Sequence, residues 1–167
     1  IIKGVLRING ASFNNPAAAI RGAATQFLTP TTETTLTIPS TAGNVITVGA
    51  YDSSTNTLAP FSGRGYTWNT GQVKPDLVAP GVGITSCAVG GGYESRSGTS
   101  MAAPFVSGSC ALLMQWGILQ NNDPFLYGEK MKAYLIRGAR QLPFSVSYPN
   151  PQSGYGALCV SNSLTFV

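Results

Sequence analysis

The most informative stretch of the sequence is SGTSMAAP at residues 97–104. It joins a glycine-rich segment, residues 90–92, to residues 101–120, which carry no charge. If a helix begins here, Ser100 lies in its first turn, where backbone N–H groups have no helical acceptor and the helix dipole favours negative charge. A serine in that position can act as a nucleophile, with the N–H groups stabilising the oxyanion that forms. The alternative is an ordinary helix cap, because serine and threonine are favoured at helix starts whatever the function.

The charge-free run at residues 101–120 is long enough to span a membrane. However, Pro104, Gly108 and Gln115 interrupt its hydrophobicity, and no basic flank marks a cytoplasmic side. We therefore expect a central helix that is buried on nearly every face in a water-soluble protein, and no membrane span.

The chain of 167 residues contains no histidine. It therefore cannot complete a Ser-His-Asp triad, a Cys-His pair or a histidine metal site by itself. A nucleophile at Ser100 would need a base from another polypeptide or from another part of the same protein. Because the chain opens at Ile1 without an initiator methionine or a signal-peptide pattern, we expect that an upstream segment has been removed.

The order of catalytic residues along the chain narrows the class of hydrolase. The α/β-hydrolases place their histidine after the serine, and chymotrypsin-like enzymes place it between a mature N-terminal isoleucine and the serine. Neither order fits a chain without histidine, and no Ser-x-x-Lys motif occurs. The order that remains is Asp, His and then Ser, with the first two before Ile1, which is the subtilisin order.

Several blocks of the sequence resemble, in order, the C-terminal half of the catalytic domain of subtilisin-like serine proteases. Residues 98–108 (GTSMAAPFVSG) resemble the block around the catalytic serine, and residues 76–81 (DLVAPG) resemble the strand and turn before it. Residues 38–52 are similar to the segment that runs from a cis-proline into a core strand, and residues 154–156 (GYG) to the turn before the last helix. The resemblance implies an α/β fold, a parallel sheet with flanking helices, present here as a C-terminal partial domain.

Residues 122–140, 148–151 and 154–159 are similar to one subgroup, the clostridial germination-type subtilases related to the Csp proteases. In that subgroup a β jelly-roll-like insert interrupts the catalytic domain. The resemblance implies that residues 1–36 are the tail of this insert and that residues 37–167 are the C-terminal part of the catalytic domain. It also implies a bacterial protein with an extracytoplasmic or spore-associated location.

Carried over to this chain, the resemblance implies a serine endopeptidase that works through an acyl-enzyme on Ser100. The Ser100 N–H would be one oxyanion donor, with Thr99 beside it, and the catalytic Asp and His and the oxyanion Asn would lie upstream of this chain. The chain alone should then be inactive. The alternative is a pseudoprotease that uses the same scaffold to bind, and a third possibility is a free-standing β-rich binding module.

The resemblance also implies residues that bind substrate. Thr37 falls near the floor of the primary specificity pocket, and Gly98 lets the backbone approach a substrate closely. Apart from the resemblance, Arg96 lies four residues before Ser100 and is a candidate for the leaving-group side of a cleft, although an exposed loop cation is the favoured interpretation. The Ile38–Pro39 peptide bond is expected to be cis.

Three of the few acidic residues have local interpretations. Asp52 ends a predicted strand beside two serines and should form an Asx-type turn. Asp76 is either a triad acid or, more simply, a local turn or cap in a strand predicted over residues 73–80. Asp123 should be the N-cap of a second helix, with Pro124 at its first position.

The composition argues against several other partners. The net charge of +4 arises from 6 acidic against 10 basic residues, and the bases are scattered without interleaved aromatic residues, so no nucleic-acid partner is expected. Cys87, Cys110 and Cys159 show no metal-ligand spacing, so we expect buried free thiols and no metal site. The chemistry requires no cofactor, and a structural calcium ion in the full-length enzyme stays an open alternative. The expected partners are a peptide or protein substrate, the N-terminal part of the same protein and, for the fragment, a second copy of itself.

Overall fold

The computed structural model describes residues 6–7, 26–27, 33–68 and 70–166. Within the N-terminal part, β1 (Leu6–Arg7) pairs antiparallel with β2 (Gln26–Phe27). The expected insert tail, residues 1–36, thus lies mostly outside the described residues, and its assignment stays a prediction.

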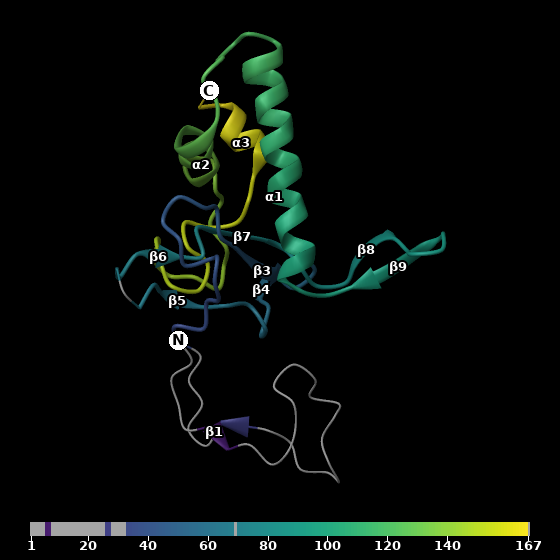
Figure 1. The fold of residues 1–167 in the computed structure, drawn as a ribbon, viewed down its shortest axis with the longest axis vertical. Coiled ribbons are helices and arrows are strands. Elements are labelled where there is room, and N and C mark those ends of the chain that lie inside the picture. The colour runs from purple at the N-terminus through teal and green to yellow at the C-terminus, as the bar shows by residue number, and fades with distance from the viewer. Residues whose placement is uncertain (1–5, 8–25, 28–32, 69, 167) are drawn as a thin grey trace.

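The described core is built on a three-stranded sheet with the order β4-β3-β7 (Figure 1). β3 (Val48–Asp52) and β7 (Leu77–Pro80) run parallel, whereas β4 (Thr57–Leu58) is antiparallel to β3. Ala50 and Leu77 are fully buried, as expected for parallel strands that are covered on both faces. The α/β class is confirmed.

The strand predicted over residues 73–80 is divided into two strands that belong to different sheets. β6 (Val73–Lys74) pairs antiparallel with β5 (Gly65–Tyr66), and only β7 joins β3. Pro75 lies at the division and has no N–H to donate to a strand partner, so it ends β6.

The helix predicted after Gly98 is confirmed and is 16 residues long. α1 (Thr99–Met114) continues into a π-helical turn, η3 (Gln115–Leu119). One face of α1 packs on β3 and β7 through buried residues that include Ala102, Val106 and Leu113.

The expectation that this helix is buried on nearly every face is wrong for the described structure. Leu112 is 55% exposed and Leu119 is 81% exposed, because the described elements cover only the face toward the sheet. By length and apolar composition alone, Thr99–Leu119 could cross a membrane, as many core helices could. Its packing on β3 and β7 is that of a core helix along one face.

The second helix begins later than the sequence predicted. α2 (Gly128–Arg137) starts after an extended Tyr127, so Asp123 and Pro124 precede it. Asp123 caps a separate turn, in which its carboxylate accepts from the Phe125 N–H at 3.3 Å. Leu126 is fully buried against η3. It packs so closely there that a Cβ added at Gly117 would lie 2.8 Å from the Leu126 Cδ2 atom. Because Leu126 must reach this position, residues 123–127 do not form the predicted first turn of the helix. The short α3 (Val160–Leu164) packs against α2.

A β-hairpin that the sequence did not predict projects from the region where α1 begins (Figure 1). β8 (Ile84–Cys87) and β9 (Tyr93–Arg96) pair antiparallel, and the glycine-rich segment at residues 90–92 forms the tip. Most of its side chains are exposed, including Tyr93 at 80%, so the strands lack the apolar alternation by which a half-buried strand is recognised.

Two local predictions are confirmed near β3. The Ile38–Pro39 peptide bond is cis. Asp52 ends β3 and forms the Asx-type turn, with the Ser54 N–H and hydroxyl donating to its Oδ1 atom at 2.8 and 2.6 Å. Lys74–Pro75 and Tyr148–Pro149 are also cis, which the sequence did not predict.

The cysteines are free, as expected, but they are not all buried. Cys110 and Cys159 are partly buried, whereas Cys87 is exposed on β8. The expectation of burial is wrong for Cys87 because the hairpin that carries it projects away from the core (Figure 1).

Candidate active site

Backbone hydrogen bonds fix the start of α1 against the end of β7. The Gly98 N–H donates to the Gly81 carbonyl at 2.8 Å. The Ser97 hydroxyl accepts from the Gly83 N–H at 2.9 Å. Since β7 is itself held in the sheet, these bonds set the position of the residues that follow Gly98.

Gly81 is needed because the backbone passes very close to its neighbours there. A Cβ at this position would lie 2.6 Å from the Ala50 Cβ and 2.9 Å from the Gly98 carbonyl oxygen. Both distances are shorter than atoms in contact tolerate, so a side chain would separate β3, β7 and α1. This packing accounts for the glycine in the DLVAPG block.

Ser100 lies in the first turn of α1 and is exposed. The Met101 N–H donates to the Gly98 carbonyl at 3.0 Å, whereas the Ser100 N–H has no acceptor among the described residues. No residue in the described part of the chain makes a hydrogen bond with the Ser100 hydroxyl either. The site therefore combines an accessible hydroxyl with an unpaired N–H at the positive end of a helix, as an oxyanion requires.

Ser100 borders a cavity of about 320 Å³. A second cavity of about 290 Å³ contains Thr37. The two cavities share part of their wall, namely Ser40, Thr47, Val48 and Thr99. Segments that are far apart in the sequence, residues 35–48 and the first turn of α1, thus form one open surface beside the hydroxyl.

The structure brings some of the predicted site residues together and separates another. Thr99 borders both cavities, Thr37 borders the second, and Gly98 is the N-cap residue of α1. Arg96 lies instead on β9, where its side chain is 60% exposed and pairs with Glu94 at 2.7 Å. This favours the alternative of an exposed loop cation, and the roles of all these residues in substrate binding stay predictions.

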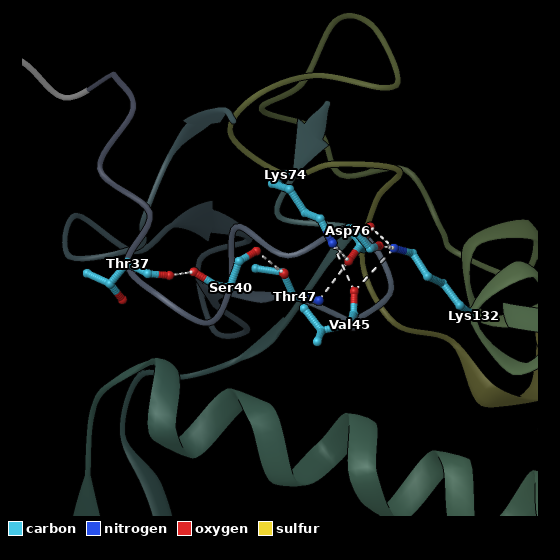
Figure 2. Close-up of polar contacts among 8 residues, drawn as sticks. Thr37, Ser40, Val45, Thr47, Lys74, Asp76 and Lys132 are labelled. Atoms are coloured by element: carbon cyan, nitrogen blue, oxygen red, sulfur yellow. Dashed lines mark hydrogen bonds and ion pairs between the residues drawn. The ribbon is translucent and has the colours of Figure 1, made fainter. Parts of the chain in front are cut away.

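Sequence reasoning missed a buried ionic cluster around Asp76 (Figure 2). The Asp76 carboxylate accepts from Lys74 Nζ at 2.7 Å, from Lys132 Nζ at 2.8 Å and from the Thr47 N–H at 2.7 Å. Asp76 is therefore neither a triad acid nor a local turn or cap, because two of its partners come from distant segments. The available signal was a Lys-x-Asp pair in a strand of a charge-poor chain, since charges within a buried strand must be paired.

Burial changes the titration of this cluster. The pKa of Lys74 is lowered, first because the ammonium is removed from water and further because the Lys132 ammonium is nearby. The ion pair with Asp76 opposes this effect and raises the pKa of Lys74 without cancelling it. The cluster thus holds two ammonium groups against one carboxylate in the interior.

No metal centre is found in the part of the chain that the structure describes. Within residues 33–68 and 70–166, no three His, Cys, Asp or Glu side chains are grouped so that they could hold a metal ion.

Comparison with known proteins assigns the family. The sequence pattern of the Subtilase family matches residues 13–157. The chain belongs to the subtilase family. The membrane-bound transcription factor site-1 protease of Homo sapiens is 40% identical over 114 residues, which are 65% of this chain and 10% of that protein. Serine protease AprX of Bacillus subtilis is 35% identical over 150 residues, which are 78% of this chain and 32% of that protein.

A solved structure extends this likeness to the fold. The CspB protease of Clostridium perfringens superposes with a TM-score of 0.82 at 52% identity, over 86% of this chain and 31% of that chain. This match confirms both the subtilase fold and the similarity to the Csp subgroup. The chain thus spans about a third or less of the length of these relatives, which are named as proteases.

Proposed function

We propose that this chain is the C-terminal portion of a subtilisin-like serine endopeptidase and that Ser100 is its nucleophile. One observation carries the proposal: Ser100 is exposed in the first turn of a long helix, beside a cavity, with its own N–H unpaired. In this proposal residues 37–167 are the C-terminal part of the catalytic domain, and residues 1–36 are the tail of an insert.

The proposed reaction begins when Ser100 Oγ attacks the carbonyl carbon of the scissile peptide bond. The oxygen–carbon bond forms, and the carbonyl electron pair moves onto the oxygen, which accepts from the Ser100 N–H. The serine proton passes to a histidine and then to the leaving amine as the carbon–nitrogen bond breaks. Water hydrolyses the acyl-enzyme in the reverse sense and restores the hydroxyl.

The base for this reaction is not in the sequence, which contains no histidine. We propose that the catalytic His, the orienting Asp and the oxyanion Asn belong to a part of the protein that precedes residue 1. Members of such a triad act as a unit, and loss of one member costs nearly as much as loss of all three. This chain by itself should therefore not cleave peptides.

The substrate is a peptide or protein, and its binding surface would be the shared wall of the two cavities. We propose that the cavity with Thr37 receives the side chain that precedes the scissile bond. Thr99 and Gly98 would lie along the substrate backbone. Arg96 would contribute only if the hairpin approaches the leaving group, and its ion pair with Glu94 argues for the simpler exposed position.

The test is labelling of the full-length protein with a fluorophosphonate, which forms a covalent bond with an activated serine. We expect labelling of the wild type that falls to background in Ser100→Ala. Ser107→Ala is the matched control, because Ser107 is an exposed serine on the same helix whose hydroxyl donates to the Ala103 carbonyl at 3.3 Å. Absence of labelling in the wild type would instead favour a pseudoprotease that uses this fold to bind.

The proposed chemistry needs no cofactor. A structural calcium ion in the full-length enzyme is a separate proposal, and a chelator should then lower its unfolding temperature. An extracytoplasmic or spore-associated location is supported by the similarity to CspB, and detection of the protein in fractionated spores tests it.

A further inference from the structure

We propose that Asp76 is a positioning residue for the substrate-binding wall beside Ser100. The wall is the segment of residues 37–48, which borders both cavities. This inference rests on the proposed function, because it assigns a specificity role within the same site. Asp76 itself borders neither cavity, and it would act through Thr47 and Ser40.

The wall is anchored to a cluster whose carboxylate and one of whose lysines are almost fully buried. Asp76 is 2% exposed and Lys74 is 1% exposed. Besides pairing with Asp76, Lys74 Nζ donates to the Val45 carbonyl at 2.9 Å. Lys132 Nζ donates to the carbonyls of Gly43 and Val45 at 3.0 and 3.2 Å. Two ammonium groups face one carboxylate, so one positive charge is left over, and the carbonyls of the wall stabilise it. Because these hydrogen bonds are needed, the wall must stay close to both lysines.

A continuous series of hydrogen bonds leads from this cluster to the specificity cavity (Figure 2). The Thr47 N–H donates to Asp76 Oδ2 at 2.7 Å, and the Thr47 hydroxyl donates to the Ser40 carbonyl at 2.6 Å. Ser40 then donates to the Thr37 carbonyl through both its N–H, at 2.8 Å, and its hydroxyl. Thr47, Ser40 and Thr37 all border the cavity that we assign to the substrate side chain.

Ser100 is held by a different set of contacts. Its position depends on the bonds of Gly98 to Gly81 and of Ser97 to Gly83, none of which involves the wall. A change at Asp76 should therefore move the wall relative to Ser100 and leave the nucleophile in place. Such a displacement weakens the binding of a peptide side chain more than it weakens attack on a small reagent.

The experiment compares peptides with a small reagent on the full-length protein. Cleavage of fluorogenic peptides that vary at the residue before the scissile bond measures how well the wall binds that side chain. The rate of labelling by a small fluorophosphonate measures the reactivity of Ser100. For Asp76→Asn we expect kcat/KM for the best peptide to fall about 10- to 100-fold, mainly through KM, with a flatter preference among peptides. The labelling rate should stay close to that of the wild type. Asp123→Asn is the matched control, since it makes the same change in a lysine-paired aspartate whose partners, Lys130 and Phe125, lie outside the wall.

A second pair of variants decides the matter if Asp76→Asn does not fold. Thr47→Val keeps the N–H bond to Asp76 but removes the hydroxyl bond to Ser40, and Thr47→Ser retains that hydroxyl. We expect a higher KM and a flatter preference in Thr47→Val and a return toward wild type in Thr47→Ser. Equal losses in peptide cleavage and labelling, or no change in either, would overturn the positioning role. Failure of the wild type to label would overturn the proposed function instead, so the two failures are distinguishable.

Discussion

The wall segment (residues 37–48) and the β8–β9 hairpin both lie next to the start of α1, but they are held in different ways. The wall is tied to the buried carboxylate of Asp76 and to two lysines. The hairpin is held mainly by its own strand pairing, and its ion pair between Glu94 and Arg96 is exposed to solvent. Ion pairs of similar length therefore have different consequences, because solvent screens the exposed pair and has much less access to the pair between Lys74 and Asp76.

The sharpest test of this difference removes two carboxylates in turn, Asp76, to which the wall is tied, and Glu94 of the hairpin. Asp76→Ala leaves the buried Lys74 ammonium and the partly exposed Lys132 ammonium without their partner, so we expect it to lower the free energy of unfolding by about 3–5 kcal/mol. Glu94→Ala removes an exposed partner and should cost less than about 1 kcal/mol. Urea unfolding of the full-length protein measures both values. Equal losses would show that the cluster is not the anchor of the wall.

A second test uses two glycines with positive φ, namely Gly154, which packs against Asp76, and Gly91 at the tip of the hairpin. A Cβ at Gly154 would lie 2.1 Å from the Pro75 carbonyl oxygen and 2.4 Å from that of Asp76, so Gly154→Ala must displace the segment that carries the cluster. We expect a loss of about 2–5 kcal/mol from overpacking and backbone strain together. At Gly91 in the hairpin tip no atom lies within 4 Å, so Gly91→Ala should cost only the strain, about 1–2 kcal/mol. The same urea titration compares them, and a smaller loss at Gly154 would mean that this turn yields easily.

The titration of Lys74 gives a third test, this time of the interior alone. Folding lowers the pKa of Lys74, chiefly through burial, so at alkaline pH the unfolded chain binds more protons than the folded protein. Stability therefore rises with pH between the folded pKa of Lys74 and its unfolded value of about 10.4. Relative to Lys74→Met, the wild type should gain at most about 1.4 kcal/mol per pH unit in this window. A difference that does not change with pH would contradict the shift.

The part of the site that the sequence predicted is encoded locally. Gly98 and the charge-free run after it were enough to place Ser100 in the first turn of a helix. Asp52 beside Ser54 was enough for the turn that ends β3. In each case the residues that determine the structure are neighbours in the chain, so a pattern of a few positions carries the information.

The rest depends on contacts between distant segments. Lys132 reaches Asp76 from α2, and nothing near either residue in the sequence shows that they meet. Burial of Leu126 delays the start of α2 even though Asp123 and Pro124 form a favourable helix start. The hairpin was not predicted because its strands make few contacts with the core and therefore show no apolar periodicity.

The smallest expected effect concerns two cysteines, one on the core helix α1 and one on the hairpin. Cys110 is a partly buried residue of α1, and burial raises the pKa of its thiol, whereas Cys87 is exposed on β8. Because only the thiolate reacts with iodoacetamide, a raised pKa leaves less reactive Cys110 at pH 8 and shifts its pH profile upward. We expect mass spectrometry to show Cys87 modified several-fold faster than Cys110, with the gap narrowing as the pH rises. Cys110→Ser removes the slow site and confirms the assignment of peptides. If Cys110 reacts as fast as Cys87 at pH 8, the second half of α1 around Cys110 is as open to solvent as the hairpin, and the predicted contrast with the hairpin is wrong there.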